Sequence, residues 1–473
     1  MERFSVVGRT ARRALEACAA VSNIRQDGGR IAPMNAFRLY RPNFAFLFGL
    51  CAAAAVAVAV EHRSASFDPV SVLELAPAEV SDPLPLAPQS TLTAADMQAA
   101  QTAWAYFSEN TQPQTGLVNA VDGFPSVTLW DFGSYLFALV SANKLGILPN
   151  SDFEDRAQRA LAALARMPLY EGLLPNKAYD TQSLAMVNYQ NESSERGVGW
   201  SAVDLGRLML ALKALQLHAP DMTPVIHEAV ARWSFEALIS DGMLFGATRD
   251  ADTQEHKLVQ EGRLGYEQYA ARALMRSGLG ATRAVSAANT VTWTEVLNVP
   301  VPDDRRSHRR FDAITTTLSE PYVLMGLELG LDDDGWQQAS QVLRAMQARH
   351  ADTGILTMLS EDHIDAPPYF LYGAVLGNGR AWTALAEDGS HHDALLSQSL
   401  KAAFGWEALF GGPYAGRVRA HVTRETATER GWMAGVYEAG SRPNTALALN
   451  TNAVVLEALH YKAFGPLVPP GRL

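Results

Sequence analysis

The sequence has few cysteines. Only Cys18 and Cys51 occur among 473 residues, and both lie near the N-terminus. The long remainder of the chain therefore has no disulfide framework, no cysteine-based zinc site and no thiol nucleophile. It also lacks a glycine-rich phosphate loop, a serine-nucleophile elbow and a dinucleotide fingerprint. These absences argue against nucleotide chemistry and serine-hydrolase chemistry, and we expect no cofactor.

Positive charge is scarce outside the N-terminus. The formal net charge is -11, although residues 1–63 hold nine arginines against four acidic residues. The rest of the chain is therefore strongly acidic. An acidic surface disfavours nucleic acids and polyanionic polysaccharides, which need a basic partner, but it accommodates neutral glycans. With 48% hydrophobic and 19% charged residues, the chain has the composition of a globular protein with a large core.

The N-terminal region reads as a targeting segment. Residues 1–42 are basic, and Met34 suggests that the first 33 residues are a mis-called start. Residues 43–60 form an uncharged apolar run, which predicts a signal peptide or a membrane anchor. We expect the rest to be periplasmic or extracellular, either secreted or tethered to the inner membrane. The alternative is a buried helix of a cytosolic protein.

Proline and alanine mark the next boundary. Residues 61–94 contain five prolines and predict an extended linker. From about residue 95 to residue 473 the apolar residues follow a helical period, interrupted by loops. We therefore expect one large helical domain over residues 95–473.

Two segments stand out within that domain, residues 130–136 and 199–208. Each places a tryptophan and an aspartate at the start of an apolar helix, as Trp130 with Asp131 and Trp200 with Asp204. A carboxylate is favoured there by the free N–H groups and the positive end of the helix dipole. A tryptophan beside an aspartate also suits a sugar, because the ring packs on C–H surfaces and the carboxylate takes hydroxyls. The alternative is a helix cap beside a core residue.

Similar polar or aromatic helix starts recur down the chain. They fall near residues 131, 204, 267, 320, 369, 406 and 451. The early spacings leave room for two helices and a loop, which predicts an all-α fold, an (α/α) barrel or toroid of about six or seven helical hairpins. The first turns of the inner helices would then meet at one mouth. The alternative is an open helical solenoid.

Several of these motifs together resemble a known family. They are Trp130-Asp131-x-Gly-Ser-Tyr, Gly199-Trp200-Ser-Ala-x-Asp204-x-Gly-Arg207, Gly265-Tyr266-Glu267-x-Tyr269, Glu320-Pro321-Tyr322, Glu361-Asp362 with Pro368-Tyr369-Phe370-x-Tyr372, and Asn450-x-Asn452. The set looks like the bacterial domain of unknown function numbered 3131, over about residues 97–464. That family is similar to glucoamylase-like (α/α)-barrel proteins, including β-1,2-glucan hydrolases. The resemblance implies this barrel and a role in an exopolysaccharide system.

The acidic residues at these starts supply the candidates for catalysis. A glycosidase needs one protonated and one ionised carboxyl group. The candidates are Glu320, Asp131, Asp204, Glu267 and Glu361. Glu320 is our preferred general acid because its apolar neighbours would raise its pKa, and Asp131 or Asp204 is the preferred base. For each acid, a helix cap or an ion pair is the alternative.

Aromatic and amide residues supply the candidates for substrate binding. These are Trp130, Trp200, Arg207, Tyr266, Tyr322, Asp362, Tyr369, Tyr372, Trp432, Asn450 and Asn452. Core packing is the alternative for each ring, and an ion pair with Asp204 is the alternative for Arg207. The acids and histidine of residues 361–365 have no recognisable metal-ligand spacing, and we expect a solvated loop there and no metal.

Three functions fit these observations. The first is an exported glycoside hydrolase acting on a neutral bacterial glucan or exopolysaccharide. The second is a non-catalytic glycan-binding or assembly subunit of an envelope polysaccharide system. The third is a polysaccharide lyase, which the acidic surface disfavours and the arginines of residues 305–310 keep open. In each case the partner is an oligo- or polysaccharide, with no nucleic acid and with an envelope association through residues 43–60.

Overall fold

The computed structural model describes residues 80–250, 253–311 and 313–469. The basic segment 1–42, the apolar run 43–60 and most of the linker lie outside these residues. In the described part, no helix is both long and apolar enough to cross a membrane.

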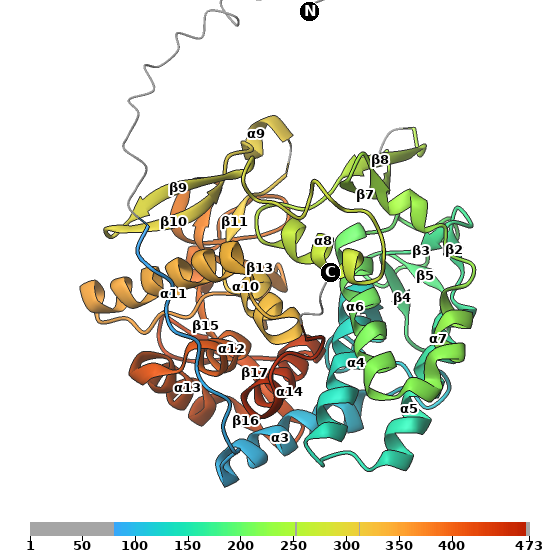
Figure 1. Cartoon of the computed structure of the whole chain (residues 1–473), viewed down its shortest axis with the longest axis horizontal. Helices are drawn as coiled ribbons and strands as arrows, with labels where there is room; N and C mark the ends of the chain where they lie inside the picture. The colour runs from blue at the N-terminus through green and yellow to red at the C-terminus, as the bar shows by residue number, and fades with distance from the viewer. Residues whose placement is uncertain (1–79, 251–252, 312, 470–473) are drawn as a thin grey trace, which may run out of the picture. The chain divides into compact units, whose positions relative to one another are not determined.

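Six inner helices form a closed ring (Figure 1). They are α4 (Leu129–Lys144), α6 (Ala202–His218), α8 (Tyr266–Arg276), α10 (Glu320–Leu324), α12 (Leu400–Phe410) and α14 (Leu449–Phe464). Each packs against the next, and α14 packs against α4. The last turn of the fourth member is a π-helical segment, Met325–Leu329. Four of them, α4, α6, α12 and α14, are predominantly apolar because they are covered on most sides, whereas α8 is amphipathic.

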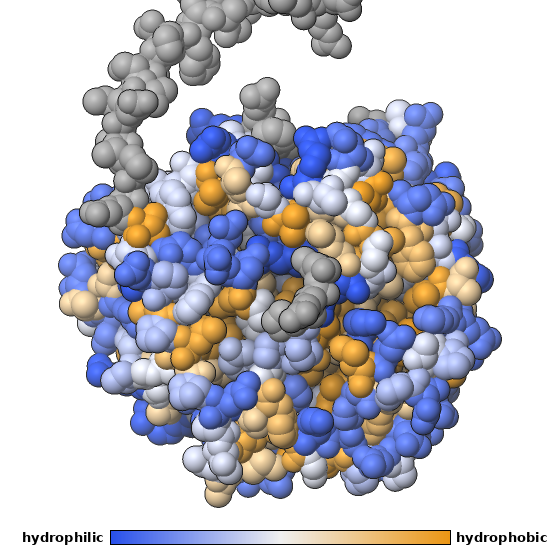
Figure 2. Space-filling view, viewed as in Figure 1, coloured by the Kyte–Doolittle hydropathy of each residue, from blue (hydrophilic) through white to orange (hydrophobic). Residues whose placement is uncertain are grey.

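A second set of helices lies outside this ring. It contains α3 (Ala94–Asn110), α5 (Asn150–Arg166), α7 (Thr223–Val230), α11 (Asp333–Thr353) and α13 (Gly412–Thr426). The buried residues of α5, such as Phe153, Ala157, Leu161 and Leu164, recur every three or four positions and form one stripe. The rest of the helix turns outward, and the face seen in Figure 2 is a mixture of polar and apolar residues.

The connections contain antiparallel strands. One sheet joins β1 (Ser126–Thr128), β4 (Ala178–Asp180) and β5 (Met186–Val187), and another joins β6 (Ile239–Ser240), β7 (Met243–Arg249) and β8 (His256–Gln260). Two pairs are β2 (Leu169–Tyr170) with β3 (Leu174–Pro175), and β9 (Val291–Val296) with β10 (Val299–Asp304). The latter pair precedes the short helix α9 (His308–Phe311), and together they stand where an outer helix would fall between α8 and α10.

Two larger sheets are formed mainly by strands that follow α10 in the chain. In one, β13 (Phe370–Gly377) pairs with β11 (Thr316–Thr317), β12 (Glu361–His363) and β14 (Arg380–Leu385). In the other, β17 (Gly431–Tyr437) pairs with β15 (Ser397–Ser399), β16 (Ala427–Thr428) and β18 (Pro443–Leu447). The expectation of helices only is therefore right for the barrel and wrong for its connections.

The predicted helix starts divide in the same way. Those near residues 131, 204, 267, 320 and 451 lie in first turns of inner helices. The start near 369 is wrong, because Tyr369 lies in the turn between β12 and β13. The start near 406 is misplaced, because α12 begins at Leu400.

Hydroxyl caps fix where three inner helices begin. The hydroxyls of Thr128, Ser201 and Ser399 accept hydrogen bonds from the backbone N–H three residues on, which begins α4, α6 and α12. In the first two helices that third residue is Asp131 or Asp204. The same caps therefore place both carboxyl groups at one end of the ring.

The part of the predicted linker that the structure describes is attached to the barrel. The carbonyl of Leu84 accepts a hydrogen bond of 2.7 Å from Nε1 of Trp336 on α11. The amides of Ala87 and Ser90 donate to backbone carbonyls of Leu409 and Lys462. Residues 81–90 therefore belong to the folded domain.

Candidate functional site

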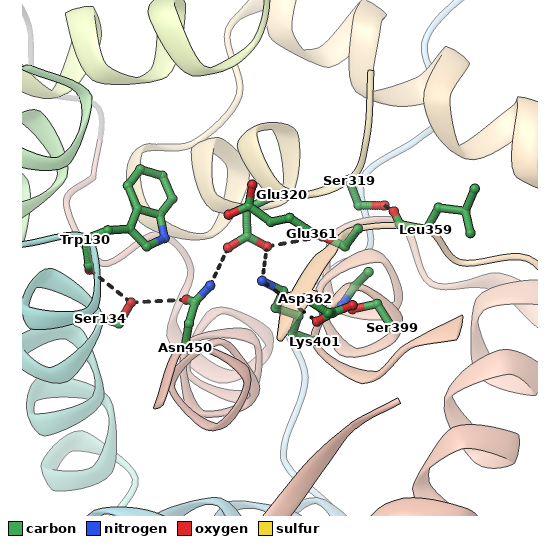
Figure 3. Close-up of polar contacts among 12 residues, drawn as sticks. Trp130, Ser134, Ser319, Glu320, Leu359, Glu361, Asp362, Ser399, Lys401 and Asn450 are labelled. Atoms are coloured by element: carbon green, nitrogen blue, oxygen red, sulfur yellow. Dashed lines mark hydrogen bonds and ion pairs between the residues drawn. The ribbon is translucent and has the colours of Figure 1, made fainter. Parts of the chain in front are cut away.

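Glu320 lies at the centre of the polar cluster in Figure 3. It is the first residue of α10 and is almost completely buried. One carboxylate oxygen accepts a hydrogen bond of 2.7 Å from Asn450, in the first turn of α14. The other is 2.9 Å from the ammonium group of Lys401 and 3.2 Å from the hydroxyl of Ser360. A carboxyl group with an ammonium partner and hydrogen-bond donors on both oxygens is an acceptor, not a proton donor.

Glu361 lies beside Glu320, but its surroundings disfavour the charged form of its carboxyl group. It belongs to β12, and one of its oxygens accepts a hydrogen bond from the hydroxyl of Tyr266 at the start of α8. Burial raises the pKa of Glu361 to about 8, and the negative charge of Glu320 adds to the rise. The surroundings of Glu361 therefore favour the protonated form of its carboxyl group.

Asp362 follows in the same strand and approaches Lys401, with 4.0 Å between its Oδ1 and the ammonium nitrogen. Burial raises the pKa of Asp362 to about 7, while Lys401 and the hydroxyl of Ser399 oppose the rise. Figure 3 shows Asp362 and Ser399 on the same side of Lys401. The single positive charge of Lys401 thus interacts with three carboxyl groups, those of Glu320, Glu361 and Asp362.

A second acidic pair lies at the start of α6. Asp204 is half-buried, and burial together with the neighbouring Glu261 raises its pKa to about 7. Glu261 is held by the backbone N–H of Ala202, so it also caps this helix. Asp131 of α4 lies within electrostatic range of Asp204. Burial raises the pKa of Tyr372, and Glu361 and Asp204 both contribute, so its phenol lies within range of both acidic groups.

Trp130 connects α4 to this cluster. Its ring contacts Tyr266 with a centroid distance of 5.9 Å, and Figure 3 shows the indole beside Glu320. Its Nε1 is buried and has no hydrogen-bond partner among the described residues. Ser134, one turn later, donates to Oδ1 of Asn450 over 3.1 Å. First turns of the inner helices therefore meet at one mouth, as the sequence predicted.

Several predicted site residues lie outside this cluster. Glu267 forms an ion pair of 2.8 Å with Arg306. The side chain of Trp200 packs against Tyr170 and donates to the carbonyl of Phe245. Tyr322 is buried and bonds to Gln338. These contacts give Glu267, Trp200 and Tyr322 structural roles, since each is satisfied within the fold.

Trp432, Asn452 and Tyr369 also lie apart from Glu320. The indole N–H of Trp432 donates to the carbonyl of Ala99, and the Asn452 amide holds the backbone of Trp432. Both are buried and tie β17 to the neighbouring helices. Tyr369 is 62% exposed in the turn between β12 and β13.

Arg207 lies one turn below the mouth and is completely buried. It does not pair with Asp204. Instead its guanidinium lies 2.9 Å from Glu328 and 3.3 Å from Glu457, and 4.6 Å from the ring centre of Trp130. It supports the site from below, because its guanidinium also donates to the carbonyl of Trp130 and to the hydroxyl of Ser134.

Sequence reasoning missed Lys401, Glu328 and Glu457. Each is a charged residue inside an otherwise apolar inner segment. The sequence could have indicated these residues, because a charge in a helix that is otherwise apolar needs a buried partner. The sequence could not show which charges pair, because Glu328 and Glu457 reach Arg207 from distant parts of the chain.

Comparisons with known proteins agree with this architecture. The model of the family described as protein of unknown function (DUF3131) matches residues 98–465. A putative glucoamylase from Bacteroides uniformis superposes with a TM-score of 0.56 at 9% identity, covering 80% of this chain and 94% of that one. An endo-β-1,2-glucanase from Chitinophaga pinensis, solved with sophorotriose and glucose, gives 0.55 at 11% identity with the same coverages. At these identities the likeness shows the glucoamylase-like fold. The search of curated proteins found no match.

Proposed function

We propose that this chain, which belongs to the DUF3131 family, is an exported glycoside hydrolase that cleaves a neutral glucan or exopolysaccharide. One observation carries the proposal. Glu361, buried beside Glu320 and with its pKa raised to about 8, lies at the mouth of a barrel where Asp204, whose pKa is raised to about 7, also lies. Two carboxyl groups of this kind are what glycosidic cleavage requires.

Each acidic residue then has a distinct role. Glu361 donates its proton to the glycosidic oxygen as the bond from that oxygen to the anomeric carbon breaks. Asp204, in its ionised form, takes a proton from the water that attacks the anomeric carbon. Glu320 forms an ion pair with Lys401, and its negative charge adds to the rise in the pKa of Glu361. This changes our sequence-based preference, in which Glu320 was the acid.

The surroundings favour a neutral substrate. Lys401 is already engaged by Glu320 and Asp362, so it offers little charge to a uronate. Arg306, in the arginine cluster that kept a lyase open, pairs with Asp304 and Glu267. The half-buried ring of Tyr266, which packs edge to face against Trp130, offers apolar surface beside Glu361. Export is inferred from residues 43–60 alone, and fractionation of cells expressing the full chain tests it.

The test is a reducing-end assay on a panel of neutral glucans. We expect Glu361→Gln and Asp204→Asn each to lower kcat by about 10²–10⁴-fold, the usual contribution of a general acid or base. The wild-type kcat/KM should rise as Asp204 ionises near pH 7 and fall as Glu361 loses its proton near pH 8. Glu154→Gln, an exposed acid on α5, is the matched control and should be unaffected.

Results that differ from these expectations would favour another catalytic residue or another function. Full activity in Glu361→Gln would remove Glu361 from the reaction. An unsaturated product that absorbs ultraviolet light would indicate a lyase. Retention of a glucan on an affinity gel with no cleavage by the wild type would favour a glycan-binding subunit.

A further inference from the structure

Three aromatic side chains continue outward from Glu361 along the β12–β13 hairpin. In this antiparallel pair Glu361 is opposite Tyr372, and His363 is opposite Phe370. Because side chains alternate along a strand, all four project from the same face of the hairpin. The register therefore places Tyr372, Phe370 and His363 in a row that begins at Glu361, and we call these three residues the aromatic strip.

Ring contacts connect the strip. The centroids of Tyr372 and Phe370 are 5.2 Å apart, and those of Phe370 and His363 are 5.1 Å apart, both edge to face. His363 lies within electrostatic range of Asp131, so the strip faces the start of α4. A strip anchored in this way keeps its shape without a ligand, which lowers the entropy cost of binding.

Exposure increases along the hairpin. Glu361 is buried, the three rings are half-buried, and Tyr369 in the turn is 62% exposed. Tyr369 also has a positive φ of 70°, which a bulky residue adopts at an energetic cost. Half-exposed rings beside a protonated acid suit the C–H faces of sugar rings, and the surrounding carboxyl groups disfavour an anionic ligand.

We propose that the aromatic strip binds the sugar units of a neutral oligosaccharide next to the unit that is cleaved at Glu361. This inference rests on the proposed function and deepens it. The strip makes the protein selective for chains of several units, because only such chains reach from Glu361 to Phe370 and His363. Tyr369 extends the same surface at the end of the hairpin.

The experiment compares chain-length dependence in Phe370→Ala and wild type, using β-1,2-linked gluco-oligosaccharides of two to seven units. We expect Phe370→Ala to raise KM for the longer chains by about 10-fold, which corresponds to about 1.4 kcal/mol and is within the range of an aromatic contact. The shortest cleaved substrate, which does not reach Phe370, should show a smaller change in KM than the longer chains. Phe370→Tyr, which keeps the ring, should restore the wild-type KM. Phe464→Ala, which removes a 46% exposed ring at the far end of α14, is the control.

A binding measurement separates this inference from the proposed function. Calorimetry with the Glu361→Gln variant measures affinity without cleavage. Affinity that increases with chain length, and loses that increase when Phe370→Ala is added, supports the strip even if the wild type cleaves nothing. Cleavage by the wild type with identical length dependence in Phe370→Ala overturns the strip and leaves the hydrolase intact. Absence of binding to every oligosaccharide also overturns the strip.

Discussion

The residues around Arg207 show how one buried charge is balanced. Glu328 accepts two hydrogen bonds from the guanidinium and one from the hydroxyl of Tyr269. Burial raises the pKa of Glu457 well above its usual range, and the charge of Glu328 adds to the rise. One oxygen of Glu457 is buried without a hydrogen-bond donor among the described residues. A proton on Glu457 accounts for both facts, so the cluster holds one positive and one negative charge.

This assignment predicts that two similar substitutions have different effects on the free energy of unfolding. Glu328→Gln removes the counter-ion of a buried arginine and should lower the free energy of unfolding by about 3–5 kcal/mol. Glu457→Gln replaces a neutral acid by a neutral amide of the same shape and should change it by less than about 1 kcal/mol. Urea unfolding at pH 7 measures both. Equal losses in the two variants would show that Glu457 is also ionised.

Residue types were predictable here, but their partners were not. Asp131, Asp204, Glu320 and Asn450 could be placed at helix starts because caps and dipoles act within a few residues. The ion pair of Glu320 depends on Lys401, which lies on another helix. The sequence could not show that contact, so it favoured Glu320 as the general acid, whereas our proposal gives that role to Glu361.

At the scale of elements, the inner helices were easier to predict than the connections. An apolar segment of between about four and five turns with a capping hydroxyl can be recognised from the local sequence, as α4 and α6 show. Strands of two or three residues, such as β11 and β12, depend on a partner that arrives later in the chain. The start expected at Tyr369 failed for this reason, since its aromatic neighbours belong to a hairpin.

The segment of residues 81–90 gives a prediction at this scale. Its backbone contacts α11, α12 and α14, through Trp336, Leu409 and Lys462. A chain of residues 91–473 should therefore be less stable than one of residues 80–473, by about 2–4 kcal/mol for several lost hydrogen bonds. Thermal unfolding of the two chains measures the difference. In the longer chain, Gln337→Ala removes only the hydrogen bond from Gln337 to the carbonyl of Ser81, and it should lower the stability much less. Coincident transitions would show that the segment contributes nothing.

At the scale of the molecule, one set of contacts explains both closure and acidity. The ring closes where α14 packs against α4, and Asn450 of α14 binds Glu320 across the mouth while Ser134 of α4 binds Asn450. Closing the ring thus gathers the first turns of the inner helices, which are where carboxyl groups are locally favoured. Bringing these carboxyl groups together excludes water from them and places like charges side by side. Assembly of the site therefore lowers the stability of the fold.

That cost predicts how stability changes with pH. The folded-state pKa of Glu361 is raised to about 8, and those of Asp204 and Asp362 to about 7. Between each ordinary value and the raised value the folded state binds more protons than the unfolded state, so stability falls as pH rises. Burial instead lowers the pKa values of His218, His363 and His460, and stability then rises with pH only up to about pH 6.5.

From pH 6.5 to 8 the carboxyl groups therefore dominate. We expect the free energy of unfolding to fall by about 2 kcal/mol over this interval from Glu361 alone, since one pH unit corresponds to 1.36 kcal/mol for a single proton. Glu361→Gln cannot ionise and should remove most of that fall, so that the variant is more stable than the wild type at pH 8. Urea unfolding at pH 6.5 and pH 8 measures this. If the wild type is equally stable at both values, Glu361 does not hold its proton in the folded state, and the acid in the reaction must be sought elsewhere in the cluster.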